Sequence, residues 1–289
     1  MGLRTKFNLA VLAAFIVGFA LAAVALQPVF QENARDEVIQ NARIMLEAAN
    51  AIRTYTTKQI QPIVAAAHQA EFQPASVPSF AAQTNFRALQ AKFTDYTYKE
   101  AALNPTNARN RAVEWEEDII RAFRDDPARG EISGMRDTPT GRSLYLARPF
   151  QIKDPGCLSC HTTPEMAPAA MVKIYGRSNG YGWKQNEVIG AQIVSVPMGL
   201  PIRNANRAFV TFMTSLTVVF AVLFVLLNIM LTQLIIEPIT QLSDLADHIS
   251  KGKVDVPELV TKGRDEVAQL SQAFNRMRRS LQKAISLLG

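Results

Sequence analysis

Charged residues are missing from two long stretches of this 289-residue sequence, 7–31 and 208–236. Over the whole chain 48% of the residues are hydrophobic, 19% are charged and 8% are aromatic. A helix of about 20 apolar residues can cross the hydrocarbon layer of a bilayer, which is about 30 Å thick, and each stretch is longer than that. The sequence therefore predicts two transmembrane helices and a chain anchored in a lipid bilayer.

The basic residues are too dispersed to indicate a nucleic-acid-binding protein, because acidic residues are interleaved with them and the net charge is only +6. Basic residues beside apolar stretches are better interpreted as topology signals or as contacts with anionic lipids. Arg4 and Lys6 precede the first stretch, and further basic residues follow the second. Both termini are therefore predicted to be cytoplasmic, with residues 32–206 in the periplasm of a bacterial inner membrane. The alternative for the first stretch is a cleaved signal peptide, since "AVA" at 23–25 resembles a cleavage site.

Cysteine occurs only twice, as Cys157 and Cys160 within the sequence CLSCH, where His161 follows directly. The pattern C-x-x-C-H is typical of covalent c-type haem attachment. Two thiols at this spacing can reach two vinyl groups on one porphyrin edge while the next imidazole comes up beneath the iron. We therefore predict one covalent haem c, with thioethers to both cysteines and His161 as the proximal iron ligand.

Other uses of this motif fit the sequence less well. A structural zinc site requires four ligands, whereas the chain has two cysteines and three histidines, and His248 is predicted to be cytoplasmic. A thioredoxin-like redox pair needs a βαβ setting, which the sequence does not indicate. A structural disulfide would leave His161 without a role. No distal His-Arg pair of the peroxidase kind is evident, and we expect the protein not to be an enzyme.

The predicted exported region begins with helices and continues as an antiparallel sheet. Residues 29–66 have helical periodicity, with Pro62 ending or kinking the helix. Leu144 and Leu146 alternate with Tyr145 and Ala147, as in a strand. CLSCH is expected in a loop between strands. The other expected elements are helices at 80–92 and 111–126 and strands at 141–152, 170–176 and 187–198.

The C-terminal segment, 237–289, contains two short heptad runs joined by a connector. Such helices cannot bury their apolar seams alone and suit a parallel four-helix bundle formed by two chains. Pro238 at the membrane exit, Gly252 before the connector and Asp265-Glu266 at the start of the second run resemble a HAMP signalling module. The resemblance implies a homodimer, and a plain coiled coil is the alternative.

Residues of about 40–200 resemble the bacterial haem-binding sensor domains labelled DUF3365, also called Tll-type PAS-like domains. The matching stretches are "NAIRTYTTKQIQP", "VPSFAAQTNF", "YKEAALNPTNARNRA", "CLSCHTTPEMAP" and "YGWKQNEVIGAQIVSVP". The resemblance implies an α+β fold in which a PAS-like sheet is flanked by a long N-terminal helix and holds haem c. It also implies a sixth iron ligand from that helix, where relatives can use a cysteine. This chain has no third cysteine.

Met45 is the first candidate for the distal ligand, because it lies on the apolar stripe of the long helix. His68 is the alternative, as the one other histidine predicted outside the cytoplasm. Met135, Met166, Met171 and an open iron position are the remaining choices. Haem propionates could be held by residues such as Arg53, Tyr55, Arg142 and Tyr145.

The main hypothesis is a membrane-bound sensor of redox state or of a diatomic gas, which signals through its transmembrane helices to a HAMP dimer and an unknown partner. The alternative is a monohaem electron carrier or an accessory subunit of a membrane redox or photosynthetic complex. The predicted domains are residues 1–31 (cytoplasmic tip and first transmembrane helix), 32–207 (haem domain), 208–236 (second transmembrane helix) and 237–289 (HAMP).

Overall fold

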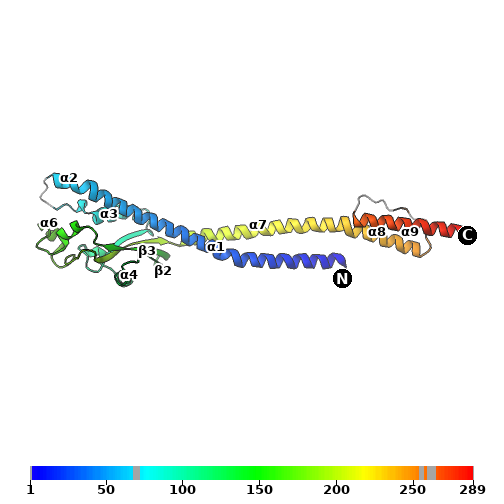
Figure 1. Ribbon diagram of the computed structural model, residues 1–289, viewed down its shortest axis with the longest axis horizontal. Helices are drawn as coiled ribbons and strands as arrows, with labels where there is room; N and C mark the ends of the chain where they lie inside the picture. Colours follow the sequence, from blue (N-terminus) through cyan, green and yellow to red (C-terminus); the bar gives the residue numbers. More distant parts are fainter. Residues whose placement is uncertain (1, 68–71, 254–256, 259–264, 289) are drawn as a thin grey trace. The chain divides into compact units, whose positions relative to one another are not determined.

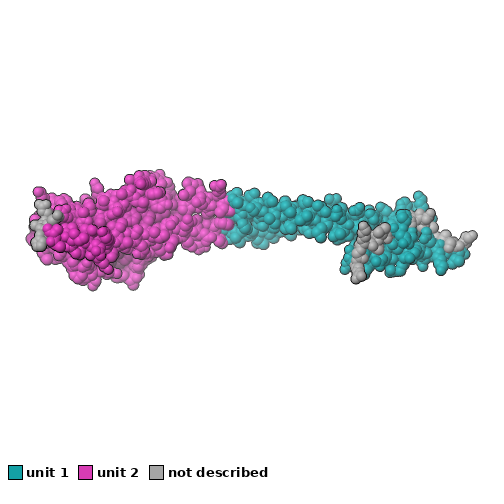
Figure 2. Space-filling view, turned by 90° about the horizontal axis from the view of Figure 1, so that it is seen from above, with its two compact units in different colours: residues 1–27, 209–289 teal, residues 28–208 magenta. Residues whose placement is uncertain are grey.

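The computed structural model describes residues 2–67, 72–253, 257–258 and 265–288. The chain forms two compact units, which Figure 2 colours separately. One unit consists of residues 28–208, and the other combines residues 1–27 with residues 209–289.

The unit of residues 28–208 is built in layers around a four-stranded antiparallel sheet with the strand order β1-β4-β3-β2. Helices α1 and α3 cover one face, and α4 packs on the other (Figure 1). The predicted α+β class is therefore confirmed. The strands are β1 (Thr97–Ala102), β2 (Ile132–Thr138), β3 (Gly141–Gln151) and β4 (Val188–Pro197), and the helices are α1 (Leu3–Tyr55), α2 (Gln61–Ala66), α3 (Pro78–Gln90), α4 (Glu114–Asp125), α5 (Leu158–His161) and α6 (Ala169–Tyr175).

The predicted alternation along β3 is confirmed. Leu144 and Leu146 are fully buried in the core between the sheet and α1, whereas Ala147 and Tyr145 join the core between the sheet and α4. Successive strand residues point to opposite faces, so one short strand contributes to both cores.

Small residues allow α1 to lie close to the sheet. Ala42 and Ala49 alternate with the larger Val38 and Leu46 along one face of the helix, and all four are fully buried. Residues three and four apart share a helix face, so this stripe matches the apolar periodicity of the sequence.

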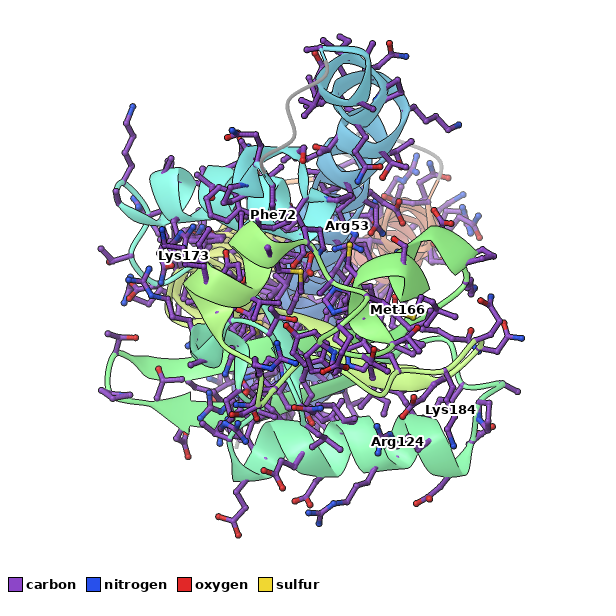
Figure 3. All side chains as sticks on the ribbon, turned by 90° about the vertical axis from the view of Figure 1, so that its left-hand side faces the viewer. Arg53, Phe72, Arg124, Met166, Lys173 and Lys184 are labelled. Atoms are coloured by element: carbon purple, nitrogen blue, oxygen red, sulfur yellow. The ribbon has the colours of Figure 1, made fainter. Side chains whose placement is uncertain are left out.

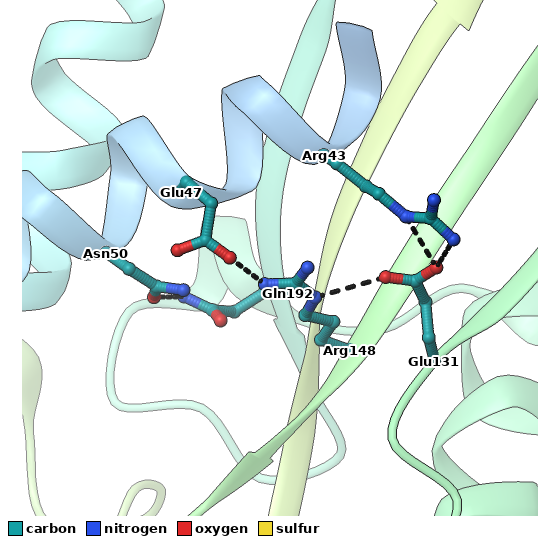
Figure 4. A network of polar contacts seen from close by, with 6 residues as sticks. All are labelled: Arg43, Glu47, Asn50, Glu131, Arg148 and Gln192. Atoms are coloured by element: carbon teal, nitrogen blue, oxygen red, sulfur yellow. Dashed lines mark hydrogen bonds and ion pairs between the residues drawn. The ribbon is translucent and has the colours of Figure 1, made fainter. Parts of the chain in front are cut away.

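Beside this stripe, ion pairs connect α1 to the sheet (Figure 4). Arg148 of β3 donates to Glu47 of α1 at 2.5 Å and to Glu131, which precedes β2, at 3.2 Å. Arg43 of α1 donates to the same Glu131 at 2.9 Å. Burial alone would raise the pKa of Glu131, but the hydrogen bonds from the two arginines outweigh it and lower that pKa.

Two predictions for this unit are wrong, and two of its strands, β1 and β2, were not predicted. Residues 169–175 form helix α6 rather than a strand, because Pro168 favours a helix start and Gly176, with a φ of 85°, ends it. CLSCH lies between β3 and β4 as expected, but in a helical turn instead of a loop. Strand β1 was missed because its sequence, TYKEAA, lacks a regular apolar alternation. Strand β2 was missed for the same reason, since its sequence, ISGMRDT, has large apolar residues only at positions 132 and 135.

Two π-helical turns interrupt the long helices, each starting six residues before a proline. Thr56–Ile60 precedes Pro62, and Thr232–Ile236 precedes Pro238. A proline lacks the N–H of a regular helical turn and its ring clashes with the carbonyl four residues earlier, so the helix widens there. Each turn starts with a threonine whose hydroxyl donates to the carbonyl four residues back.

The second unit contains most of each predicted apolar stretch and the C-terminal helices. By length and composition, two continuous helical segments, Leu3–Ala66 and Gly199–Ser250, are apolar enough to cross a membrane. Asp265 accepts a hydrogen bond from the Ala268 N–H at 2.8 Å, which caps the last helix as an N-cap residue does. The remaining helices are α7 (Gly199–Leu231), α8 (Glu237–Ser250) and α9 (Glu266–Leu288).

Candidate functional site

The CLSCH segment forms a compact turn between β3 and β4. A short 3-10 turn, Pro155–Cys157, leads directly into α5. The Asp154 carboxylate accepts a hydrogen bond from the Gly156 N–H at 2.8 Å and so fixes the start of this turn. Because residues three apart lie on the same side of a helical turn, Cys157 and Cys160 face the same cavity, together with His161. Both thiols are free, and burial raises the pKa of Cys157.

His161 is held in one defined tautomer. Its Nδ1 lies 2.7 Å from the carbonyl oxygen of Gly180. A carbonyl can only accept, so Nδ1 must carry the proton and Nε2 keeps a free lone pair. Burial lowers the pKa of His161 and thus favours the neutral ring. A neutral imidazole whose second nitrogen donates to a backbone carbonyl is the form in which histidine binds a metal.

A flat aromatic surface supports the His161 ring. Trp183 stacks on it, with ring centroids 3.8 Å apart and planes 12° from parallel. The backbone holds the two rings together, since the Trp183 N–H donates to the carbonyl of His161 at 3.2 Å. The orientation of the imidazole is therefore set from both sides, by a hydrogen bond and by stacking.

A second loop fixes the position of Gly180. The Gly180 N–H donates to the Asn104 side-chain oxygen, and the Asn104 amide donates to the carbonyl of Tyr181, each at 3.1 Å. Gly180 has a φ of 84°, and a Cβ there would overlap the Thr106 hydroxyl and lie 2.7 Å from the Thr106 Cα. Only glycine combines this backbone conformation with this close approach.

The CLSCH segment opens into a cavity of about 740 Å³. This volume is within the range of about 300–1,000 Å³ that is usual for sites of small molecules and cofactors. Residues of α1, α3, β1 and the β3–β4 connection line it. Figure 3 labels Arg53 and Phe72, which belong to its wall, and Arg124 of α4, on the other side of the sheet.

One wall of the cavity carries a buried polar network. Glu100 of β1 accepts hydrogen bonds at its Oε1 from Arg53 of α1 and from the Tyr98 hydroxyl, each at 2.7 Å. Gln192 of β4 donates to the Tyr98 oxygen at 3.0 Å and to the Asn50 side chain at 3.1 Å. Burial, and next the Glu100 carboxylate, raise the pKa of Tyr98, which therefore remains a hydrogen-bond donor at neutral pH.

The structure separates the candidate distal ligands. Met45 is not among the residues that line the cavity but packs, partly buried, against the core beneath α1. It lies eight residues before Arg53, or roughly 12 Å along the helix axis at about 1.5 Å per residue. His68 lies outside the described residues. Among the other candidate methionines, the buried Met171 lines the cavity, whereas Met135 and Met166 are exposed and do not line it.

The residues present fit a covalently attached haem. Two free thiols and a neutral imidazole with an available Nε2 lie in the wall of one cavity. Arg53, Lys58 and Arg87 supply positive charge in the same wall, which suits the carboxylates of a porphyrin. Sequence reasoning found the thiols and the imidazole but missed Glu100 and the loop of Asn104 and Thr106, because these depend on contacts between distant segments.

Comparison with known proteins identifies both parts of the chain. Residues 31–197 match the Tll0287-like family, and residues 230–283 match the HAMP domain. No curated protein matches the chain. The crystal structure of the cyanobacterial haem protein Tll0287 is similar over 56% of this chain and 95% of its own, with 14% sequence identity and a TM-score of 0.44. The predicted resemblance is confirmed, and the chain belongs to the Tll0287-like family and carries a HAMP domain.

Proposed function

We propose that this chain is a membrane-anchored c-type haem protein in which one covalent haem regulates a cytoplasmic HAMP dimer. The observation that carries the proposal is the His161 ring, held by Gly180 and Trp183 with Nε2 free, beside two free thiols in one cavity. The structure of the cyanobacterial haem protein supports it only by resemblance. The protein would act as a binding and signalling protein and not as an enzyme.

In this proposal each side chain has a defined role. Cys157 and Cys160 form thioethers to the porphyrin, and His161 Nε2 binds the iron while the Gly180 carbonyl holds the proton on Nδ1. Arg53 places a positive charge in the cavity wall for a propionate. When bound, the haem supplies a one-electron redox centre and, where no distal ligand occupies it, a position for a diatomic gas.

Signalling would follow from the helices that the cavity shares with the rest of the chain. Asn50, Arg53 and Thr54 line the cavity and belong to α1, whose first part is a candidate transmembrane span. The haem domain would lie in the periplasm, with both termini in the cytoplasm, as the basic residues beside the spans predict. A change of redox state or of gas binding would then reach the HAMP domain through the spans.

The exposed face of the C-terminal helices supports a dimer. Leu270, Met277 and Leu281 lie at heptad spacing on α9, and each is at least 40% exposed. Ile239 on α8 is exposed as well. A second copy of the chain would cover these apolar side chains in a four-helix bundle.

The first test is the covalent haem. The purified full chain should give the alkaline pyridine spectrum of haem c, and the colour should stay with the polypeptide in acidified acetone. Replacing both cysteines with serine should leave at most a haem that acidified acetone removes. A wild-type protein whose pigment is extracted by this treatment would disprove the c-type assignment.

The second test addresses signalling. With both native cysteines used by the haem, a single Met277→Cys substitution gives one reactive thiol on the proposed dimer face. Its maleimide labelling rate should differ between the oxidised and reduced protein by severalfold. Gln272→Cys, an exposed site about half a helical turn around α9, is the matched control and should change less. Equal rates in both oxidation states, with fast electron exchange, would favour the electron carrier over the sensor.

A further inference from the structure

The Glu100 carboxylate is an unusual group in the wall of the cavity. Its side chain is only 1% exposed, although it lies among residues that line an open cavity. Oε1 is fully engaged by Arg53 and Tyr98. Oε2 is buried and has no hydrogen-bond partner within the part of the chain that the structure describes. A buried acceptor without a partner is costly, so it marks a place where a further group binds.

A proton can bind Oε2 with the least change to the surrounding hydrogen bonds. Protonation of Oε2 leaves both hydrogen bonds to Oε1 in place, since Arg53 and Tyr98 are donors. It also removes the negative charge from a carboxylate whose Oε2 is buried without a partner among the described residues. Arg53 stays charged in either state, because guanidinium is not deprotonated in proteins, and it stacks over Phe150 at 4.6 Å.

The other charged groups around the cavity cannot replace Glu100 in this role. Asp154, the second carboxylate of the lining, is exposed and already accepts from Gly156. Lys58 and Arg87 are exposed cations, whose effect water and salt screen. Tyr98 remains protonated because of its raised pKa, and Tyr175 of α6 lies in the half-buried rim of the cavity. Glu100 is thus the buried acidic group that faces the cavity.

We propose that Glu100 Oε2 binds one proton when the haem of the proposed function is reduced, so that reduction is proton-coupled. A one-electron donor supplies the electron, the ferric iron becomes ferrous, and a proton from solvent forms an O–H bond on Oε2. The net charge of the cavity is then the same before and after the reaction. The reason is electrostatic, since an added negative charge in a buried site of low dielectric favours protonation of a carboxylate in the same site.

This proposal requires that haem be bound, so the pyridine spectrum is recorded first. The reduction potential of the full chain is then measured by spectroelectrochemistry at a series of pH values. One proton per electron predicts a fall of about 59 mV for each tenfold decrease in proton concentration. Glu100→Gln should abolish this slope, whereas the matched control Glu116→Gln should keep it. Glu116 is also buried and paired, with Lys99 at 2.6 Å, but does not line the cavity.

A measurement on the unmodified protein keeps the proposal open to refutation even if Glu100→Gln does not fold. Reduction in weakly buffered solution should take up about one proton per haem, and infrared difference spectra should gain a carboxylic acid band that shifts in heavy water. Bound haem with a potential independent of pH, or a slope that persists in Glu100→Gln, would overturn this inference and leave the proposed function standing. Absence of bound haem would overturn both.

Discussion

The clamp around His161 can be tested at Gly180. We expect Gly180→Ala to destabilise the protein more than Gly182→Ala, although both glycines have a positive φ, 84° and 77°. A Cβ at Gly182 would meet nothing within 4 Å, whereas one at Gly180 would overlap Thr106. The two variants therefore share the cost of a left-handed residue, about 1–2 kcal/mol, and differ in the steric overlap.

The difference between the two variants follows from that overlap. Forcing an extra methyl group into a packed site costs typically about 1–3 kcal/mol. Taking about 2 kcal/mol, the melting temperature of a domain of this size should be roughly 4–8 °C lower in Gly180→Ala than in Gly182→Ala. Circular dichroism of the full chain in detergent measures this difference.

The same two variants also test whether the Gly180 carbonyl orients the His161 imidazole. A shift of Gly180 moves its oxygen away from His161 Nδ1, now 2.7 Å distant. The absorption spectrum of the haem should therefore change in Gly180→Ala and stay as in the wild type in Gly182→Ala. Equal melting temperatures and equal spectra would refute the reasoning that Thr106 and Gly180 position the imidazole.

Four further predictions follow from individual side chains. Met45→Ala should lower the melting temperature without changing the haem spectrum in either oxidation state, since Met45 packs in the core. Met171→Ala should change the spectrum if its thioether binds the iron. A spectral change in Met45→Ala alone would instead indicate Met45 as the distal ligand. Glu131 has a lowered pKa, so its stabilising effect, about 1 kcal/mol, is present above the unfolded-state pKa of about 4.3 and lost as the pH falls below it. The free energies of unfolding in urea of the wild type and Glu131→Gln should therefore differ at pH 7 and converge in acid. A difference that stays constant with pH would contradict the lowered pKa of Glu131. Pro62→Ala restores a backbone donor and should convert the π turn to α-helix, seen as slower amide hydrogen exchange at residues 56–62; unchanged exchange would show that proline is not its cause. Gln192→Leu should reduce the redox dependence of labelling at the HAMP domain while keeping the haem, and undiminished dependence would exclude a route through this amide.

The sequence predicted the parts of the site that are local in the chain. CLSCH is a contiguous motif, and its spacing alone places two thiols and an imidazole on one short turn. The loop that orients the imidazole could not be predicted, because Asn104 and Gly180 are 76 residues apart and meet only in the folded chain. The glycine-rich segment around Gly180 was visible in the sequence, but nothing in it indicates which neighbour demands a glycine.

The choice of Met45 shows the limit of periodicity as a guide to a site. The apolar stripe of α1 was identified correctly, and its residues Val38, Ala42 and Leu46 are fully buried against the sheet. That stripe marks where the helix meets the core. The cavity lies further along, where α1 presents Asn50, Arg53 and Thr54. The polar residues that follow the apolar stripe along α1 were therefore the better indication, in the sequence, of the wall of the cavity.

The packing of α1 on the sheet limits how a change in the cavity can be transmitted to the candidate spans. Sliding of α1 against the sheet would expose Val38 and Leu46, at a cost of about 1.5–3 kcal/mol for each side chain, and would also break the ion pairs of Figure 4. Moving a two-state equilibrium from 1:99 to 99:1 requires about 5.5 kcal/mol. The free energy lost by sliding α1 would offset most of that amount. The central strand β4 offers a route without sliding, because Gln192 joins it to the cavity wall and it ends at Pro197, two residues before α7 begins. We therefore expect the sheet and residues 34–49 of α1, which pack on it, to move as one body, with β4 carrying the change to the second candidate span.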